Sequence, residues 1–140
     1  MLYFAYGSNL DRALMRANCP TARPLGVAML DNHRFIIAAC GYASVQPRVG
    51  SNVPGVLWQI TPRDEDALDR YESIATGLYD RATLPVRRQG GRMNVLVYIA
   101  CARGTGRPQP GYLDRVLAAA RDWRLPDRHV TAIARWGAAG

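Results

Sequence analysis

Short apolar runs, each bounded by turn-forming residues, constrain the fold of this 140-residue chain more than any other feature. Runs of this length that end at Gly, Asn, Asp or Pro are typical of β-strands. Asp31-Asn32-His33 lies between two of them and predicts a hairpin turn, and Gly90-Gly91 predicts another. The predicted strands cover residues 2–6, 26–30, 34–39, 56–60, 78–86 and 93–101.

Helical signals fall between these strands. Thr61 is a good N-cap, Pro62 suits the first helical position, and acidic residues follow, so a helix is predicted from there to about Tyr71. A short helix near residues 10–17 has Ser8 or Asn9 as its expected cap. Two amphipathic helices are predicted later, and a long loop interrupts the strands. These segments are 110–123 and 127–136 for the helices and 41–54 for the loop, with a flexible tail at 137–140.

The order of these elements mixes hairpins with helices and lacks a regular β-α alternation. It predicts an α+β fold with a mixed, largely antiparallel sheet that can curl into a small barrel with flanking helices. A chain of 140 residues fits one domain, so residues 1–140 are expected to form a single unit.

The composition indicates the kind of cellular environment in which we expect the protein. No apolar run approaches the roughly 20 residues that a membrane helix needs. The N-terminus does not resemble a secretory leader, because Asp11 and Arg12 follow the first apolar run. The three cysteines are odd in number and lack metal-ligand spacing, so neither a disulfide framework nor a metal site is predicted. We therefore expect a cytoplasmic protein with reduced thiols and no membrane partner.

The positive charge of the chain leaves one alternative function open. The net charge is +7, and all 18 basic residues are arginine, which indicates a compositional bias. Such a charge is typical of proteins that bind nucleic acids, but the arginines are scattered and no aromatic-basic motif accompanies them. We expect no nucleic-acid partner, and a basic nucleic-acid-binding protein stays the weaker alternative.

Two features can carry chemistry. The strand that ends at Gly7-Ser8-Asn9 can direct backbone N–H groups at a carboxylate or an oxyanion, although an ordinary turn has the same pattern. Glu72 is one of only two glutamates and lies where the helix from Thr61 should end, so the helix dipole can raise its pKa. A solvated surface acid is the simpler reading of Glu72. His33 and His129 have no triad context and are expected to be turn or surface residues.

Four motifs in order resemble the gamma-glutamyl cyclotransferase-like family. The opening segment, residues 3–10, reads Tyr-Phe-Ala-Tyr-Gly-Ser-Asn-Leu and is similar to the family's signature. Residues 53–58 resemble the strand before its catalytic helix, and residues 68–72 with 77–79 resemble the catalytic segment. Residues 108–112 are similar to the Pro-rich entry to its late helix.

The resemblance implies a cofactor-independent cyclotransferase that releases 5-oxoproline from a gamma-glutamyl amino acid or amine. It implies Glu72 as the general acid and base, a small-molecule gamma-glutamyl substrate, and no metal. The substrate-binding residues that it implies are Tyr3, Phe4, Ala5, Tyr6, Gly7, Ser8, Asn9, Tyr79, Tyr98 and Tyr112.

Several alternatives stay open at this point. A related cyclotransferase for a tailored metabolite would have the same motifs, because the leaving-group pocket is expected to come from variable loops at residues 41–54 and 103–108. A non-catalytic small-molecule binding module of the same fold is the main alternative, since fold does not fix function. The protein is expected to be a monomer or a homodimer.

Overall fold

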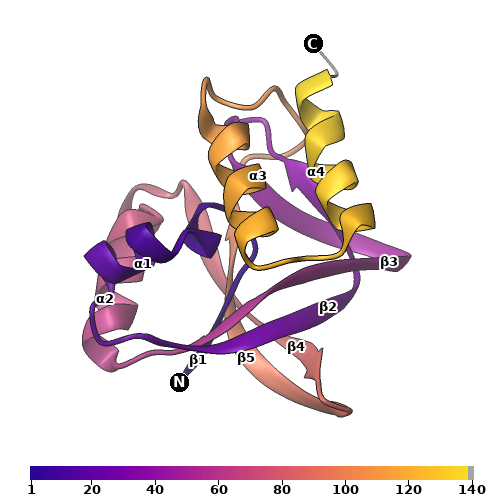
Figure 1. Cartoon of the computed structure of the whole chain (residues 1–140). Helices are drawn as coiled ribbons and strands as arrows, with labels where there is room; N and C mark the ends of the chain where they lie inside the picture. Colours follow the sequence, from indigo (N-terminus) through magenta and orange to yellow (C-terminus); the bar gives the residue numbers. More distant parts are fainter. Residues whose placement is uncertain (139–140) are drawn as a thin grey trace.

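The computed structural model describes residues 1–138 (Figure 1). Its strands and helices alternate irregularly along the chain, as the sequence predicts. The strands are β1 (Leu2–Ala5), β2 (Arg23–Ile37), β3 (Ala43–Gln59), β4 (Tyr79–Arg88) and β5 (Gly91–Ala100). The α-helices are α1 (Arg12–Asn18), α2 (Pro62–Tyr71), α3 (Tyr112–Asp122) and α4 (Asp127–Ala138), and short 3₁₀ turns lie at Ser8–Leu10 and Ile74–Thr76.

The strands close into a barrel in the order β1-β3-β2-β4-β5. β1 pairs antiparallel with β3, and β2 pairs antiparallel with both β3 and β4. The barrel closes where Tyr3 of β1 pairs in parallel with Leu96 of β5. The prediction of a mixed, largely antiparallel sheet curled into a small barrel with flanking helices is confirmed.

The hairpin predicted at Asp31-Asn32-His33 is wrong. Residues 23–37 form one strand, and the chain turns back at residues 38–42 to enter β3. Asn32 has a positive φ of 57° and lies at a register irregularity, so its turn-like character bends the strand without ending it. Local turn signals cannot distinguish a bulge of this kind from a hairpin.

The long loop predicted at residues 41–54 is also wrong, because most of it belongs to β3. Pairing with β2 overrides its weak strand propensity, from Ala43 opposite Ile37 to Asn52 opposite Asp31. Residues 48–51 lie opposite Asn32 alone and form a protruding bulge. The Asn32 side chain accepts a hydrogen bond from the Gly50 N–H at 3.2 Å.

The helices agree with the sequence more closely. Thr61 caps α2 and forms a capping box with Asp64. The first helix differs in its cap: Asp11, not Ser8 or Asn9, accepts from Ala13 and Leu14 N–H, because Ser8 and Asn9 belong to the preceding 3₁₀ turn. The other two boundaries shift slightly, since α3 begins at Tyr112 and α4 continues to Ala138. The predicted flexible tail at 137–140 overlaps α4, and residues 139–140 lie outside the described part of the chain.

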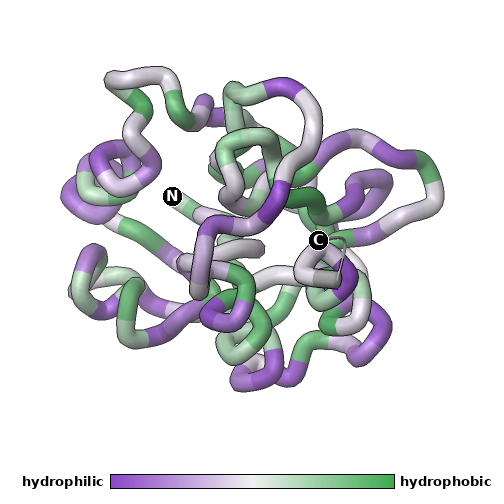
Figure 2. The backbone as a smooth tube through the Cα atoms, turned by 90° about the horizontal axis from the view of Figure 1, so that it is seen from above, coloured by the Kyte–Doolittle hydropathy of each residue, from purple (hydrophilic) through white to green (hydrophobic). Residues whose placement is uncertain are grey.

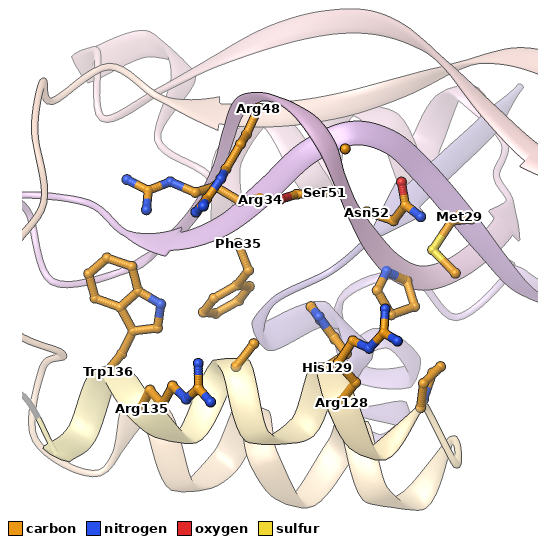
Figure 3. Close-up of a pocket in the computed structure, with 14 residues that line it drawn as sticks. Met29, Arg34, Phe35, Arg48, Ser51, Asn52, Arg128, His129, Arg135 and Trp136 are labelled. Carbon is orange, nitrogen blue, oxygen red and sulfur yellow. The ribbon is translucent and has the colours of Figure 1, made fainter.

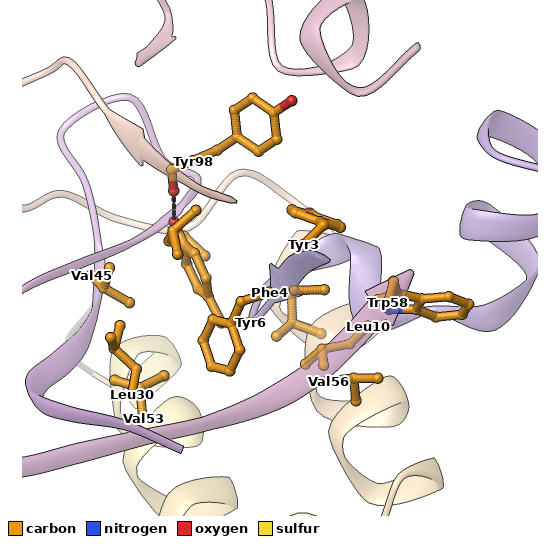
Figure 4. Close-up of a cluster of buried hydrophobic side chains, with 14 of the residues drawn as sticks. Tyr3, Phe4, Tyr6, Leu10, Leu30, Val45, Val53, Val56, Trp58 and Tyr98 are labelled. Carbon is orange, nitrogen blue, oxygen red and sulfur yellow. Dashed lines mark hydrogen bonds between the residues drawn. The ribbon is translucent and has the colours of Figure 1, made fainter. Parts of the chain in front are cut away.

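The core fills the barrel and extends under the helices. Figure 4 shows Phe4, Tyr6 and Leu10 among the buried side chains of the strands. α3 and α4 lie side by side against one part of the barrel, and α1 and α2 lie together at another (Figure 1). Hydrophilic residues recur along the outer turns of the tube (Figure 2). Within residues 1–138, no helix has the length and apolar character needed to cross a membrane.

Candidate functional site

Glu72 lies directly after α2, at the position that the sequence indicates. It is the C-cap residue, and its N–H donates to the Leu68 carbonyl at 2.8 Å. The residue is half-buried, and this burial raises its pKa to about 7. A carboxyl group with such a pKa can both accept and release a proton near neutral pH. Glu72 is therefore not the solvated surface acid of the simpler reading.

Asn9 connects the opening segment to Glu72. Its Nδ2 donates to the Tyr3 hydroxyl at 2.9 Å and lies 3.5 Å from Glu72 Oε1. The residue is only 2% exposed, and its Oδ1 is buried without a hydrogen-bond partner among residues 1–138. Buried polar atoms are nearly always paired, so the unpaired oxygen of Asn9 is an unusual free acceptor beside a carboxyl group.

Six tyrosines surround Glu72. Burial is the main cause that raises the pKa of each phenol, and the nearby Glu72 carboxylate raises it further. All six phenols therefore stay neutral near pH 7 and keep their hydroxyl protons for hydrogen bonding. These residues are Tyr3, Tyr6, Tyr71, Tyr79, Tyr98 and Tyr112.

Most of these hydroxyls are held in fixed positions. Tyr6 donates to the Tyr98 carbonyl at 2.6 Å, shown as a dashed line in Figure 4. The Tyr98 hydroxyl donates to Asp69 Oδ1, also at 2.6 Å. Tyr79 donates to the Ala43 carbonyl, and the Ala43 N–H donates to the Tyr112 hydroxyl at 3.1 Å. The tyrosines thus form rigid walls around the carboxyl group.

The turn at Gly7-Ser8-Asn9 has free backbone donors. Its two hydrogen bonds are donated by the Leu10 and Asp11 N–H groups to the Gly7 and Ser8 carbonyls. Within residues 1–138, the N–H groups of the three turn residues make no hydrogen bond to the protein. Gly7 is also tightly packed, because a Cβ atom there would lie 3.2 Å from the Tyr112 hydroxyl.

The structure brings most of the predicted site residues together. Tyr3, Asn9, Tyr79, Tyr98 and Tyr112 cluster around Glu72, next to the Gly7 turn. Phe4 and Ala5 are fully buried in the barrel, and the Phe4 ring lies against Tyr6 with centroids 6.4 Å apart. Substrate contact by each of these residues stays a prediction.

Sequence reasoning missed two members of this cluster. Tyr71, adjacent to Glu72, has its hydroxyl 3.1 Å from Ser8 Oγ. Asp69 holds the Tyr98 hydroxyl and pairs with Arg81 at 2.9 Å. The sequence signal that could have identified both residues is their place beside Glu72 in the motif at residues 68–72.

The two histidines also differ from expectation. His129, predicted to be a turn or surface residue, is only 6% exposed because α4 packs this side chain against Phe35. His33 lies inside β2 and is half-buried. Among residues 1–138, no group of three His, Cys, Asp or Glu residues is arranged to hold a metal ion. The three cysteines are free thiols.

Burial of Glu72 has a consequence for stability. Because its folded pKa is raised above the usual 4.5 to about 7, the folded state holds this proton more tightly than the unfolded state. The associated stability is present below about pH 4.5 and is lost as the pH rises through about 7. The substitution Glu72→Gln, which keeps the side chain neutral, should raise the free energy of unfolding by up to about 3 kcal/mol at alkaline pH.

Urea unfolding at about pH 4 and about pH 8.5 measures this effect. The gain from Glu72→Gln should be large at the alkaline pH and small at the acidic pH. An equal gain at both values would show that Glu72 has an ordinary carboxyl pKa.

The barrel and the site together define a class of protein: a small mixed β-barrel with a protonatable carboxyl group enclosed by tyrosines at the end of a helix. Residues 3–125 match the family described as "Gamma-glutamyl cyclotransferase, AIG2-like". The chain belongs to this gamma-glutamyl cyclotransferase family.

Individual relatives agree with this assignment. The chain is 26% identical over 136 residues to a gamma-glutamylcyclotransferase of Homo sapiens, covering 89% of this chain and 72% of the relative. A gamma-glutamylcyclotransferase of Mus musculus is also 26% identical, with 91% and 74% covered. A solved structure titled "Gamma-glutamyl cyclotransferase" shares the fold with a TM-score of 0.88 at 24% identity, over 96% of this chain and 86% of the other.

Proposed function

We propose that this protein releases 5-oxoproline from gamma-glutamyl compounds, with Glu72 as the proton carrier. The observation that supports this most is a carboxyl group with a pKa near 7 beside the unpaired Asn9 Oδ1 and the free N–H groups of the Gly7 turn. The family membership supports the same reaction class. No cofactor is needed, because every proton that the reaction moves can pass through one carboxylate.

The reaction begins with the α-ammonium of the gamma-glutamyl group. The Glu72 carboxylate accepts a proton from it, and the freed amine attacks the side-chain carbonyl carbon of the same glutamyl group. The new C–N bond closes a five-membered ring, and Glu72 returns the proton to the leaving nitrogen as the bond to that nitrogen breaks. The ring nitrogen then loses its second proton to the Glu72 carboxylate, which passes it to the released amine, so that Glu72 ends as it began. The products are 5-oxoproline and the free amine or amino acid.

Asn9 and the Gly7 turn have complementary tasks in this reaction. The buried Asn9 Oδ1 accepts a hydrogen bond from the substrate nitrogen, which holds it close to Glu72. The free N–H groups at residues 7–9 donate to the carbonyl oxygen as negative charge develops on it. One such donor is typically worth about 3 kcal/mol in the transition state. Rigid tyrosine walls favour the folded substrate conformer that ring closure requires.

The leaving group is proposed to lie beside two segments that meet near Tyr112. The β2–β3 turn and the loop before α3 are joined by a hydrogen bond from Gln109 N–H to the Gly41 carbonyl at 3.0 Å. The Tyr42 and Tyr112 rings lie edge to face with centroids 5.2 Å apart. These segments, not the whole of residues 41–54, are the part of the predicted loop region that can shape a leaving-group pocket.

Asn9→Ala tests the role of the amide. Its loss removes the donor near Glu72 and the acceptor for the substrate nitrogen, so we expect kcat/KM to fall about 100-fold. The acid limb of the pH profile should also move upwards, since the ionised Glu72 loses a hydrogen-bond donor. Asn94→Ala, at an exposed position on β5, is the matched control. An unchanged pH profile in Asn9→Ala would contradict this role.

The proposed function is tested by incubating the protein with a panel of gamma-glutamyl amino acids and gamma-glutamyl amines. Each reaction is assayed for 5-oxoproline by mass spectrometry. Release of 5-oxoproline from at least one member identifies both the activity and the leaving group. Binding of panel members without any turnover would instead indicate a non-catalytic module of the same fold.

A further inference from the structure

A cavity lies in a part of the fold that contains none of the residues clustered around Glu72. It has a volume of about 770 Å³ and lies between α4 and the strands β2 and β3 (Figure 3). The protruding bulge at residues 48–51 contributes to one wall, and residues at and after the start of α4 form the other. None of its lining residues belongs to the cluster around Glu72. We call this cavity the α4 groove.

Four arginines line the α4 groove, and no acidic residue does. Arg34 and Arg48 come from the strands, and Arg128 and Arg135 come from the helix (Figure 3). The two helix arginines are seven residues apart, so they lie on one helix face about 10 Å from each other.

The four arginines of the groove have no acidic partners in the described part of the chain. Within residues 1–138, none of the four forms an ion pair, whereas Arg12, Arg81 and Arg87 each contact an aspartate. Arg34 donates from Nε to the neutral Gln46 side chain at 2.5 Å. The guanidinium groups of the groove therefore keep their capacity to bind an anion, and Arg binds phosphate through paired hydrogen bonds.

Aromatic and neutral polar groups lie among the arginines. Trp136 is half-buried at one end of the groove, near Phe35, as Figure 3 shows. His129 is 94% buried, and its Nε2 has no hydrogen-bond partner among residues 1–138. Burial lowers the pKa of His129 to about 4, so the ring is neutral at pH 7 and can donate or accept a hydrogen bond. His129 Nε2 is therefore a hydrogen-bonding group in the wall of the groove that no protein atom within residues 1–138 uses.

We propose that the α4 groove binds a small phosphate-bearing molecule with a flat ring, of the nucleoside polyphosphate class. The arginines bind the phosphates, Trp136 stacks on the ring, and His129 forms a hydrogen bond with a polar atom of the ligand. The volume lies within the usual range of about 300–1,000 Å³ for small-molecule sites. Because the basic residues and the aromatic residue line one cavity of this volume, a single nucleotide fits better than an extended nucleic acid. This proposal is independent of the reaction at Glu72.

Isothermal titration with ATP, inorganic triphosphate and adenosine tests the proposal. We expect ATP to bind most tightly, triphosphate to bind more weakly because it lacks the ring, and adenosine to bind weakest because it lacks the phosphates. The double variant Arg48→Ala with Arg135→Ala should weaken ATP binding by at least about tenfold. Trp136→Leu should reduce the difference between ATP and triphosphate.

A matched control distinguishes binding at a specific site from attraction to the overall positive charge of the chain. The double variant Arg16→Ala with Arg63→Ala removes two exposed arginines outside the groove, so both double variants have a net charge of +5, which is +7 minus 2. The control should bind ATP within about twofold of the unaltered chain. Circular dichroism verifies that all variants are folded.

Four results would overturn the proposal. The first is no ATP binding at millimolar concentration by the unaltered chain. The second is an equal loss of ATP binding in both double variants, which would indicate non-specific attraction. The third is tighter binding of a single-stranded RNA oligonucleotide than of ATP, which would assign the groove to a nucleic acid. The fourth is dimer formation that Arg48→Ala with Arg135→Ala abolishes, which would assign the groove to a second copy of the chain.

Discussion

Replacing Glu72 with glutamine should lower kcat/KM for 5-oxoproline release by at least about 1,000-fold while leaving the protein folded. Gln has nearly the same shape as Glu, and it is neutral like the protonated form of Glu72. It cannot take a proton from the substrate ammonium or return one to the leaving nitrogen. Both proton transfers are therefore lost at once, although the tyrosine walls and the Gly7 turn remain.

A steady-state assay with direct detection of 5-oxoproline measures this loss. The control is Glu65→Gln, because Glu65 is the other glutamate of the chain and lies on α2, the helix that Glu72 follows, where it pairs with Arg81. Its loss removes one partly exposed ion pair, so turnover should stay near that of the unaltered protein. Near-normal turnover by Glu72→Gln would remove Glu72 from the mechanism.

Replacing Gly55 with alanine should lower the free energy of unfolding by at least about 3 kcal/mol. Gly55 lies in β3, where β1 crosses closely. A Cβ atom there would overlap the Ala5 carbonyl oxygen and approach the Phe4 ring to 2.6 Å. Phe4 is fully buried, so neither the ring nor the strand has room to move. The same β1 strand leads into the Gly7 turn, so activity should fall together with stability.

Denaturant unfolding with Gly91→Ala as the control measures this effect. Gly91 also lies in a strand, but a Cβ atom there would have only the Arg88 carbonyl within 4 Å, at 3.8 Å. Alanine should therefore be tolerated at Gly91. Equal stabilities of the two variants would show that the close approach of β1 and β3 is not a constraint on the fold.

Local signals in the sequence predicted the parts of the fold that depend on neighbouring residues. The cap at Thr61 and the proline after it defined the start of α2, because both act within one helical turn. The paired glycines likewise placed the turn between β4 and β5. Since Glu72 follows α2 directly, its position at the helix end was predictable too.

Features that depend on distant contacts were not predictable in this way. Residues 41–54 have turn-like composition, and only pairing with β2 makes them a strand. The burial of His129 depends on how α4 packs against Phe35. The assembly of six tyrosines around Glu72 depends on the closed barrel, because no spacing in the sequence brings them together. The family resemblance pointed to five of them and missed Tyr71.

The origin of the oxygen atoms in the product tests the central claim most directly. The protein is incubated with a substrate from the gamma-glutamyl panel in water enriched in oxygen-18, and the products are analysed by mass spectrometry. Intramolecular attack by the amine predicts 5-oxoproline without the heavy isotope and an equal amount of the free leaving amine. Glutamate that has gained one oxygen-18 atom would contradict the account, because it would show that water, not the substrate's own amine, attacks the carbonyl carbon.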